Sequence, residues 1–297
     1  MRVKEIICTN RNGDSLLISK SSIYKPVEDL DTTGVKASIT YATNYRVHGA
    51  TMVSSRLEQR DLSLLFYISV AGKTEDWIQK KRDQVFKVFN PIYNPVTLQL
   101  KTKTKDLRVD VNVETTPSIA PGFANSNRVW QKVLVQLSAG NPFFQDAETE
   151  KVEIATWVPE FEFSFEIPEE GIEMGARSPS LIVNVLNNGQ IATGMTIQFK
   201  ALGTVSNPSL FNVNTREMFK INKVMQAGEV ITVNTNQGKK RVESSLNGVT
   251  TNIFNYMEFG SKFMQLEVGD NLFRYDADSN LENLEVSIYF TPKYIGV

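Results

Sequence analysis

Few side chains in this sequence have the types and spacing that catalysis or metal binding requires. The 297 residues include one histidine, His48, and one cysteine, Cys8. A Ser-His-Asp triad or a His-based metal cluster would depend on His48 alone, which lies beside a glycine in YRVHGAT. Structural zinc needs four Cys or His ligands, and one cysteine allows no intramolecular disulfide. We therefore predict that the protein is not an enzyme and that it uses no cofactor and no metal.

One short stretch has the residue types of a calcium loop. Asp276-Ala277-Asp278-Ser279-Asn280 matches the start of an EF-hand, but Leu281 stands where the glycine belongs and Ser287 where the bidentate glutamate belongs. We interpret the stretch as a turn rich in Asp and Asn, with weak cation binding as the lesser alternative. Dinucleotide-binding and P-loop glycine patterns are absent from the sequence. Paired carboxylates for glycoside hydrolysis stay open, because such pairing is spatial.

Three lysines, Lys101, Lys103 and Lys105, repeat at a spacing of two. This spacing would place them on one side of a strand and its extension, either as an exposed basic edge or as a surface that faces an acidic partner. Charge is also divided along the chain: residues 1–144 have a net charge of +7 and residues 145–297 a net charge of -8. The formal total of -1 argues against a dedicated nucleic-acid-binding protein.

The segment TEDWIQKKRDQVFKVF, from Thr74 to Phe89, has the strongest helical pattern in the chain. Thr74 suits the N-cap, and the two acidic residues after it are favoured at the positive end of the helix dipole. Apolar residues recur at helical spacing, and Asn90-Pro91 ends the pattern because the residue before proline avoids the α region. An amphipathic helix among strands must cover a sheet, so we predict that this helix, residues 74–89, organises an N-terminal domain.

The sequence on both sides of this helix has strand patterns. Asn12-Gly13-Asp14 is a hairpin pattern, and the segment ends at Asn141-Pro142-Phe143-Phe144, which we interpret as a domain junction. We therefore predict a β-sandwich-like N-terminal domain over residues 1–145. The expected strands are 3–9, 15–20, 96–101, 107–114 and 129–137.

Composition changes after residue 145. Between Asp146 and Glu173 ten residues are acidic and one, Lys151, is basic. Phe161, Phe163, Phe165 and Ile167 alternate there with polar residues, which is typical of a half-buried strand with an acidic outer face. We interpret residues 146–174 as an acidic connector.

Residues 175–297 have the pattern of an antiparallel β-sandwich. Short strands alternate with turn pairs such as Asn188-Gly189 and Asn247-Gly248, which is typical of sandwiches and jelly rolls. The expected fold class is therefore mainly β, with one helix in the N-terminal domain. The expected strands are 181–186, 195–201, 210–212, 217–221, 230–234, 240–243, 263–266, 271–275 and 284–290.

Aromatic residues gather near the end of this second domain. Phe263 and Phe273 lie within strand patterns, so we expect them to be buried. Tyr256 and Phe259, beside Gly260, are the better candidates for exposure and for contact with a glycan or a partner.

The order of three features resembles the distal tail protein (Dit) family of long-tailed siphophages. The first is Asn141-Pro142-Phe143-Phe144 just after a strand that contains Trp130, and the second is the helix that ends before Asn90-Pro91 and is followed by VTLQLK. The third is a C-terminal run with NVNT at 212–215, AGEVITVNT at 227–235, Asn252 and VGDN at 268–271. The resemblance covers nearly the whole chain, and the long acidic connector departs from it.

The resemblance implies a structural virion protein. Such proteins form a hexameric ring at the distal end of the tail tube, with C-terminal domains that look like galectins or carbohydrate-binding jelly rolls. The implied partners are further copies of the chain, the major tail tube protein, the tail-associated fibre or lysin protein, the tape measure protein and a receptor-binding protein. DNA would pass through the lumen without specific binding. The implied location is the virion tail tip, after assembly in the host cytoplasm. The edge from Lys101 to Asp110 would supply a ring contact through strand addition.

A second class of function stays open from the residues alone. The C-terminal sandwich could act as a carbohydrate-binding module or as part of a glycan-active protein, and binding of a glycan by residues 175–297 would discriminate the two classes. No apolar run reaches the roughly 20 residues of a membrane span, and the first residues lack the pattern of a signal peptide. We therefore expect no membrane insertion.

Overall fold

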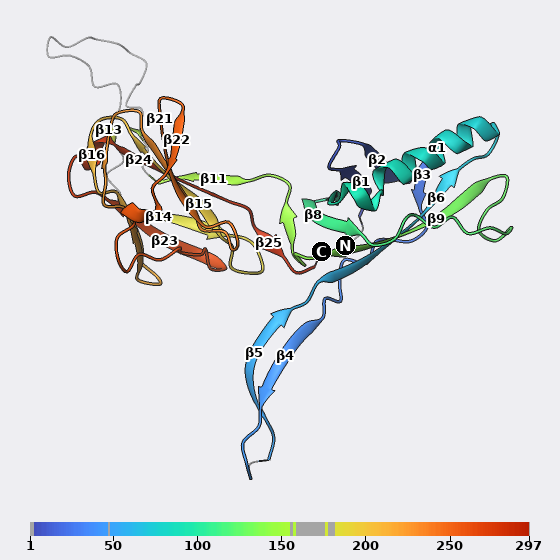
Figure 1. Ribbon diagram of the computed structural model, residues 1–297, viewed down its shortest axis with the longest axis horizontal. Coiled ribbons are helices and arrows are strands. Elements are labelled where there is room, and N and C mark those ends of the chain that lie inside the picture. Colours follow the sequence, from blue (N-terminus) through green and yellow to red (C-terminus); the bar gives the residue numbers. More distant parts are fainter. Residues whose placement is uncertain (1–2, 47, 155–156, 159–175, 178–181, 297) are drawn as a thin grey trace. The chain divides into compact units, whose positions relative to one another are not determined.

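The computed structural model in Figure 1 describes residues 3–46, 48–154, 157–158, 176–177 and 182–296. Its contacts divide the chain into two compact units. The first unit consists of Met1–Glu148 together with Tyr294–Val297, and the second is Thr149–Lys293. The chain therefore passes from one unit to the other twice, and the second unit is an insertion into the first.

The first unit is built on a nine-stranded sheet in the order β25-β10-β8-β7-β1-β2-β3-β6-β9. The far end of β8 also pairs with β9, at Asn112–Ser138 and Val113–Leu137, so the sheet closes on itself from β8 round to β9. β2 and β3 are parallel, while β1 pairs with β2 and β7 in antiparallel fashion. The strands are β1 (Glu5–Asn10), β2 (Ser15–Ser19), β3 (Tyr24–Pro26), β6 (Arg60–Ser69), β7 (Val96–Lys101), β8 (Asp106–Val113), β9 (Trp130–Ala139), β10 (Phe144–Asp146) and β25 (Lys293–Tyr294).

Strand alternation explains the core of this unit. Side chains along a strand point alternately to opposite faces, and in β7 every second residue is buried while those between are half-buried. The same alternation runs along β6, β8 and β9, so one face of the curved sheet is continuously apolar. Burial of that face supplies the main favourable free energy of folding of the unit.

The helix α1 (Glu75–Val88) lies against β1 and β2. Thr74 is its N-cap and accepts a hydrogen bond from the backbone nitrogen of Trp77, and Phe89 is its C-cap. Val85, Val88 and Phe89 are fully buried in the core. The predicted helix over residues 74–89 is therefore confirmed. The short 3-10 helix η1 (Pro91–Tyr93) follows it.

The second unit has two principal antiparallel sheets that share one apolar core. Their strand orders are β11-β24-β15-β20-β21-β22 and β14-β23-β17-β18. The larger sheet contains β11 (Glu150–Glu153), β15 (Met195–Ala201), β20 (Val230–Asn234), β21 (Arg241–Leu246), β22 (Val249–Asn252) and β24 (Leu284–Phe290). The smaller contains β14 (Ile182–Asn187), β17 (Ser209–Asn212), β18 (Glu217–Lys220) and β23 (Gly269–Asp276), and the remaining elements are β12 (Trp157–Val158), β13 (Ala176–Arg177), β16 (Val205–Ser206), β19 (Val224–Met225), η2 (Phe254–Tyr256) and η3 (Leu281–Asn283).

The mainly-β class with one α-helix is confirmed, and some details differ from the sequence-based expectation. The first unit is one sheet closed on itself, where two packed sheets were expected. Along the chain, the boundary between the two units falls between residues 148 and 149. Residues 150–153, which were expected to be part of a connector, pair with β24 of the second unit. The strand expected over residues 263–266 is absent from the structure. Within these residues only Leu266 forms an isolated bridge, to Thr193. The alternating stretch Phe161, Phe163, Phe165 and Ile167 lies outside the described residues.

In the part of the chain that the structure describes, no helix is long and apolar enough to cross a membrane.

Candidate functional site

A long hairpin in the first unit exposes apolar side chains. It consists of β4 (Ala37–Ala42) and β5 (Thr51–Leu57), which among the described strands pair only with each other (Figure 1). Ile39 and Tyr41 share one face of β4, and Tyr41 pairs across the hairpin with Met52. These three side chains are 44%, 57% and 58% exposed. An isolated two-stranded hairpin is only marginally stable in water, so this surface is suited to a partner that covers it.

Arg60, at the start of β6, joins three distant segments of the same unit. It is 2% exposed, and its guanidinium donates hydrogen bonds to the backbone oxygens of Pro142 (2.8 Å), Thr32 (2.8 Å) and Ile295. The guanidinium also lies 4.6 Å from the centre of the Phe144 ring. Burial lowers the pKa of Arg60, and nearby Asp31 partly offsets that effect. The planar fork of an arginine suits this task because it has five donors in fixed directions.

The residues that follow the second unit complete the first. The hydroxyl of Tyr294 donates to the carboxylate of Asp146 at 2.9 Å, and the Tyr294 side chain is 5% exposed. The ammonium of Lys105 lies 3.5 Å from the centre of the Tyr294 ring, a cation–π contact. Together with the Arg60–Ile295 bond, these contacts fix the last residues of the chain on the first unit.

The predicted junction Asn141-Pro142-Phe143-Phe144 lies at this same place. Asn141 forms an Asx turn by accepting from the backbone nitrogen of Phe143, Pro142 accepts from Arg60, and Phe144 begins β10 fully buried. The structure therefore brings the junction residues to Arg60 and the chain end. The sequence contains one signal that points to Arg60. It occupies the position in β6 that shares a face with Leu62, an inward position that rarely holds a charge without partners.

The three predicted lysines do not lie on one exposed strand edge. Lys101 ends β7, which pairs with β1 on one side and β8 on the other, so no edge is free there. Lys103 lies in the turn between β7 and β8, and Lys105 contacts Tyr294. The expectation of a free edge from Lys101 to Asp110 is therefore wrong, because that edge is paired within the unit. A role of these lysines in assembly stays a prediction.

Tyr256 and Phe259 lie on a loop of the second unit, residues 253–262, which we call the aromatic loop. The exposed fraction is 43% for Tyr256 and 104% for Phe259, while Phe254 is 45% exposed. The loop follows β22 and includes η2, and Gly260 (φ +91°) makes the turn after Phe259. The predicted exposure of these two side chains agrees with the structure, and their contact with a glycan or partner stays a prediction.

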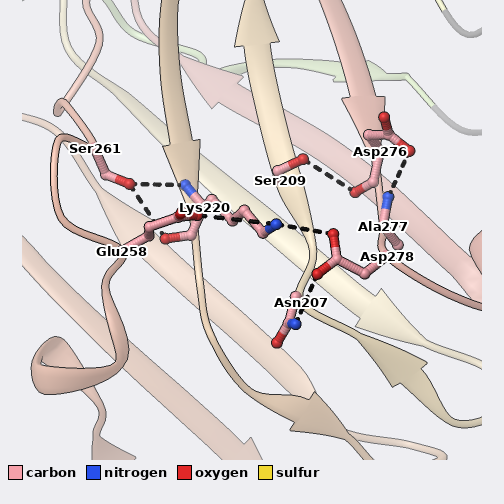
Figure 2. Close-up of polar contacts among 8 residues, drawn as sticks. All are labelled: Asn207, Ser209, Lys220, Glu258, Ser261, Asp276, Ala277 and Asp278. Atoms are coloured by element: carbon pink, nitrogen blue, oxygen red, sulfur yellow. Dashed lines mark hydrogen bonds and ion pairs between the residues drawn. The ribbon is translucent and has the colours of Figure 1, made fainter.

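A polar network holds the aromatic loop against β18 (Figure 2). The backbone nitrogen of Lys220 donates to the Ser261 hydroxyl at 3.0 Å, and this hydroxyl donates back to the Lys220 oxygen at 3.3 Å. The backbone nitrogen of Glu258 donates to the same Lys220 oxygen at 2.9 Å. Fixed backbone contacts of this kind keep the exposed aromatic side chains in one place rather than on a loosely held turn.

The side chain of Lys220 occupies the acidic turn that resembled a calcium loop. Its ammonium lies 2.8 Å from Asp278 and 3.9 Å from Glu258, and Asn207 donates to Asp278 at 2.8 Å (Figure 2). Hydrogen bonds from Lys220 and Asn207 lower the pKa of Asp278. Among the described residues no group of three His, Cys, Asp or Glu side chains is placed to hold a metal ion. The ammonium of Lys220 lies in this turn, and cation binding at residues 276–280 stays the lesser alternative.

His48, the single histidine, lies in the connection between β4 and β5 and is exposed. Cys8 is fully buried in the core of the first unit, and burial raises the pKa of its thiol. A buried thiol of this kind behaves as a small apolar side chain.

Two known protein families match the sequence. The family described as phage tail protein RIFT-related domain matches residues 12–167, and the family described as siphovirus-type tail component, C-terminal domain, matches residues 188–294. No curated protein matches the sequence.

One solved structure shows the same fold over nearly the whole chain. The crystal structure of SPP1 Dit, described as a paradigm of hub adsorption apparatus in phages that infect Gram-positive bacteria, aligns with a TM-score of 0.68 and 13% identity. The alignment covers 97% of this chain and 98% of that one. Two structures of the phage P2 baseplate in its activated conformation, with Ca and with Sr, align at a TM-score of 0.48 with 11% and 10% identity. These cover 100% and 99% of this chain, and 100% of each of those chains.

The family match over more than half of the chain shows that this protein is a structural component of the phage tail. The chain belongs to the siphophage distal tail protein family.

Proposed function

We propose that six copies of this protein form a ring at the distal end of the tail tube. The ring joins the tube to the fibre or receptor-binding apparatus of the tail tip. Membership in the family supports a role in the phage tail. The observation that supports ring formation is the β4–β5 hairpin with its exposed apolar side chains. In a ring the contact between neighbours is heterologous, so the hairpin of each copy meets a different surface on the next.

The proposed neighbours follow from this position. Above the ring lies the major tail tube protein with the tape measure protein, and below it the tail-associated fibre or lysin protein, with a receptor-binding protein at the periphery. DNA passes through the lumen without specific binding, since tight counterion-release binding would hold it back. Assembly takes place in the host cytoplasm. Lys101 at the end of β7 and Lys103 in the turn after it, which together we call the lysine turn, form a second proposed contact with an acidic neighbour.

One pair of substitutions tests the hairpin. Tyr41→Asp places a charge on the apolar face of β4, whereas Thr40→Asp places the same charge on the opposite, exposed face one residue away. The proposal predicts that Tyr41→Asp lowers the fraction of ring at a fixed protein concentration and that Thr40→Asp leaves it unchanged, as measured by native mass spectrometry. Equal ring formation by the two variants would remove the hairpin as the contact.

The lysine turn has its own test. Lys101→Glu with Lys103→Glu should weaken binding to an acidic neighbour without changing the ring itself, and the effect should fade at high salt. Unchanged incorporation into tails in a complementation assay would contradict this second contact.

A further inference from the structure

The second unit has a groove of about 390 Å³ beside the aromatic loop. This volume lies in the range of small-ligand sites. Two glutamates, two lysines, an amide and an aromatic ring supply most of its lining: Glu217, Glu267, Lys240, Lys262, Gln265 and Phe263.

One wall of the groove is built by alternation. Met264 and Leu266 are buried in the core, whereas Phe263, Gln265 and Glu267, which alternate with them along the sequence, line the groove. A bridge between Thr193 and Leu266 holds this extended segment, and the Nε2 of Gln265 donates to the Thr235 backbone oxygen at 2.9 Å. The wall is therefore fixed by the same contacts that form the core.

The charges of the lining cancel. Lys262 pairs with Glu217 at 3.1 Å, whereas no described ion pair involves Glu267 or Lys240. Lys240 instead lies 5.4 Å from the centre of the Phe263 ring. Carboxylates accept hydrogen bonds and ammonium groups donate them, so the groove offers both kinds of partner with no net charge.

An aromatic surface continues from the groove. Phe263 stacks on Phe254 with ring centres 5.9 Å apart and planes 21° apart, and Phe254 is still 45% exposed. Phe254 belongs to the aromatic loop, which the Lys220–Ser261 contacts hold in place. A fixed, partly exposed ring beside hydrogen-bonding groups offers an apolar face and polar partners to one ligand.

We propose that this groove binds a neutral saccharide. Sugar hydroxyl groups both donate and accept, which matches a lining with both kinds of partner, and the C–H face of a sugar ring can lie on an aromatic ring. A polyanion fits poorly, because two carboxylates line the groove and residues 149–293 carry 12 basic and 18 acidic side chains. The site lies within one copy of the chain and therefore does not depend on the ring.

Affinity electrophoresis of the full-length protein tests the proposal. The native gels contain dextran, mannan or galactan as neutral probes, and polyphosphate as the anionic probe. The groove variant combines Lys240→Ala with Glu267→Ala, and the matched control combines Lys239→Ala with Glu282→Ala, two exposed residues outside the groove. Both variants lose one positive and one negative charge, so their mobilities in plain gels stay comparable.

The expected result is retardation of the wild type and the control by at least one neutral polysaccharide, with binding about tenfold weaker in the groove variant, in line with lost hydrogen bonds to charged groups. Retardation by polyphosphate alone would overturn the proposal in favour of an anionic ligand. No retardation by any neutral probe, or equal retardation of the two variants, would also overturn it.

Discussion

The guanidinium of Arg60 donates a hydrogen bond to the backbone oxygen of Ile295, 235 positions further along the chain. The second unit is inserted between these two points, since its residues are Thr149–Lys293. The first unit is therefore complete only when residues 294–297, which follow the second unit, have been made. For a protein that assembles into a larger particle, this topology makes completion of the first unit depend on prior synthesis of the second.

Replacement of Arg60 by lysine tests the importance of this contact. An ammonium cannot reach three backbone oxygens in the directions of a guanidinium, so Arg60→Lys leaves buried oxygens without donors. We expect a loss of about 2–4 kcal/mol in the free energy of unfolding. Calorimetry of the full-length protein would measure it, with Arg11→Lys, at an exposed turn, as the control. Equal stability of the two variants would contradict the role given to Arg60.

A substitution at Gly189 tests how the second unit packs against Lys293, its last residue before the chain returns to the first unit. A Cβ there would lie 2.9 Å from both the backbone nitrogen and the oxygen of Lys293, and Gln190 donates to that oxygen at 2.8 Å. Gly189→Ala should therefore destabilise the second unit by about 1–3 kcal/mol, because backbone atoms must move. Gly140→Ala is the matched control, since a Cβ there meets nothing within 4 Å. Denaturant unfolding would compare them, and a Gly189→Ala protein as stable as the control would refute the close approach.

Glu229 predicts a pH dependence of stability. It is 1% exposed and accepts hydrogen bonds from Lys223, Ser244 and the backbone of Gln226. Burial raises the pKa of this carboxyl, but the three hydrogen bonds outweigh burial and hold the pKa below its usual range. A depressed folded-state pKa stabilises the protein above the unfolded-state value of roughly 4.3, and this stabilisation is lost as pH falls through the folded-state pKa.

Substitution of this carboxyl gives the corresponding measurement. Glu229→Gln should lower the free energy of unfolding by about 1–3 kcal/mol near neutral pH and should flatten its decline in acid. Urea unfolding at neutral and acidic pH would show this, with Glu282→Gln, at an exposed site, as the control. If the wild type and Glu229→Gln lost stability in parallel below about pH 4.3, the acid-induced loss of stability would have to come from a group other than Glu229.

Local patterns were predictable from the sequence. The helix was placed correctly because its N-cap at Thr74 and its end before Asn90-Pro91 are both set by neighbouring residues. Strands β15, β20 and β24 were predicted with their observed bounds, since turn residues flank them closely. The type of fold follows from such local signals, because they set the length and the burial pattern of each element.

Long-range relationships were not predictable in the same way. The spacing of Lys101, Lys103 and Lys105 predicted one side of a strand and its extension, but β7 ends at Lys101 and the other two lysines follow it. Only the pairing of β7 with β1, far earlier in the chain, and with β8 decides that its edge is not free. Arg60 likewise could be recognised as an inward charge, while its partners Thr32, Pro142 and Ile295 come from three separate segments. Pairing across such distances depends on the closed sheet, and one sequence does not specify it.

The mass of the full-length protein in solution tests the central claim most directly. Native mass spectrometry across a micromolar dilution series would separate the assembled ring from the single chain, because dilution shifts the equilibrium between them by mass action. The account predicts a species of six chains, about 200 kDa from six copies of 33.4 kDa, which Tyr41→Asp depletes and Thr40→Asp does not. A 33.4 kDa monomer at every concentration, for the wild type and both variants, would contradict it.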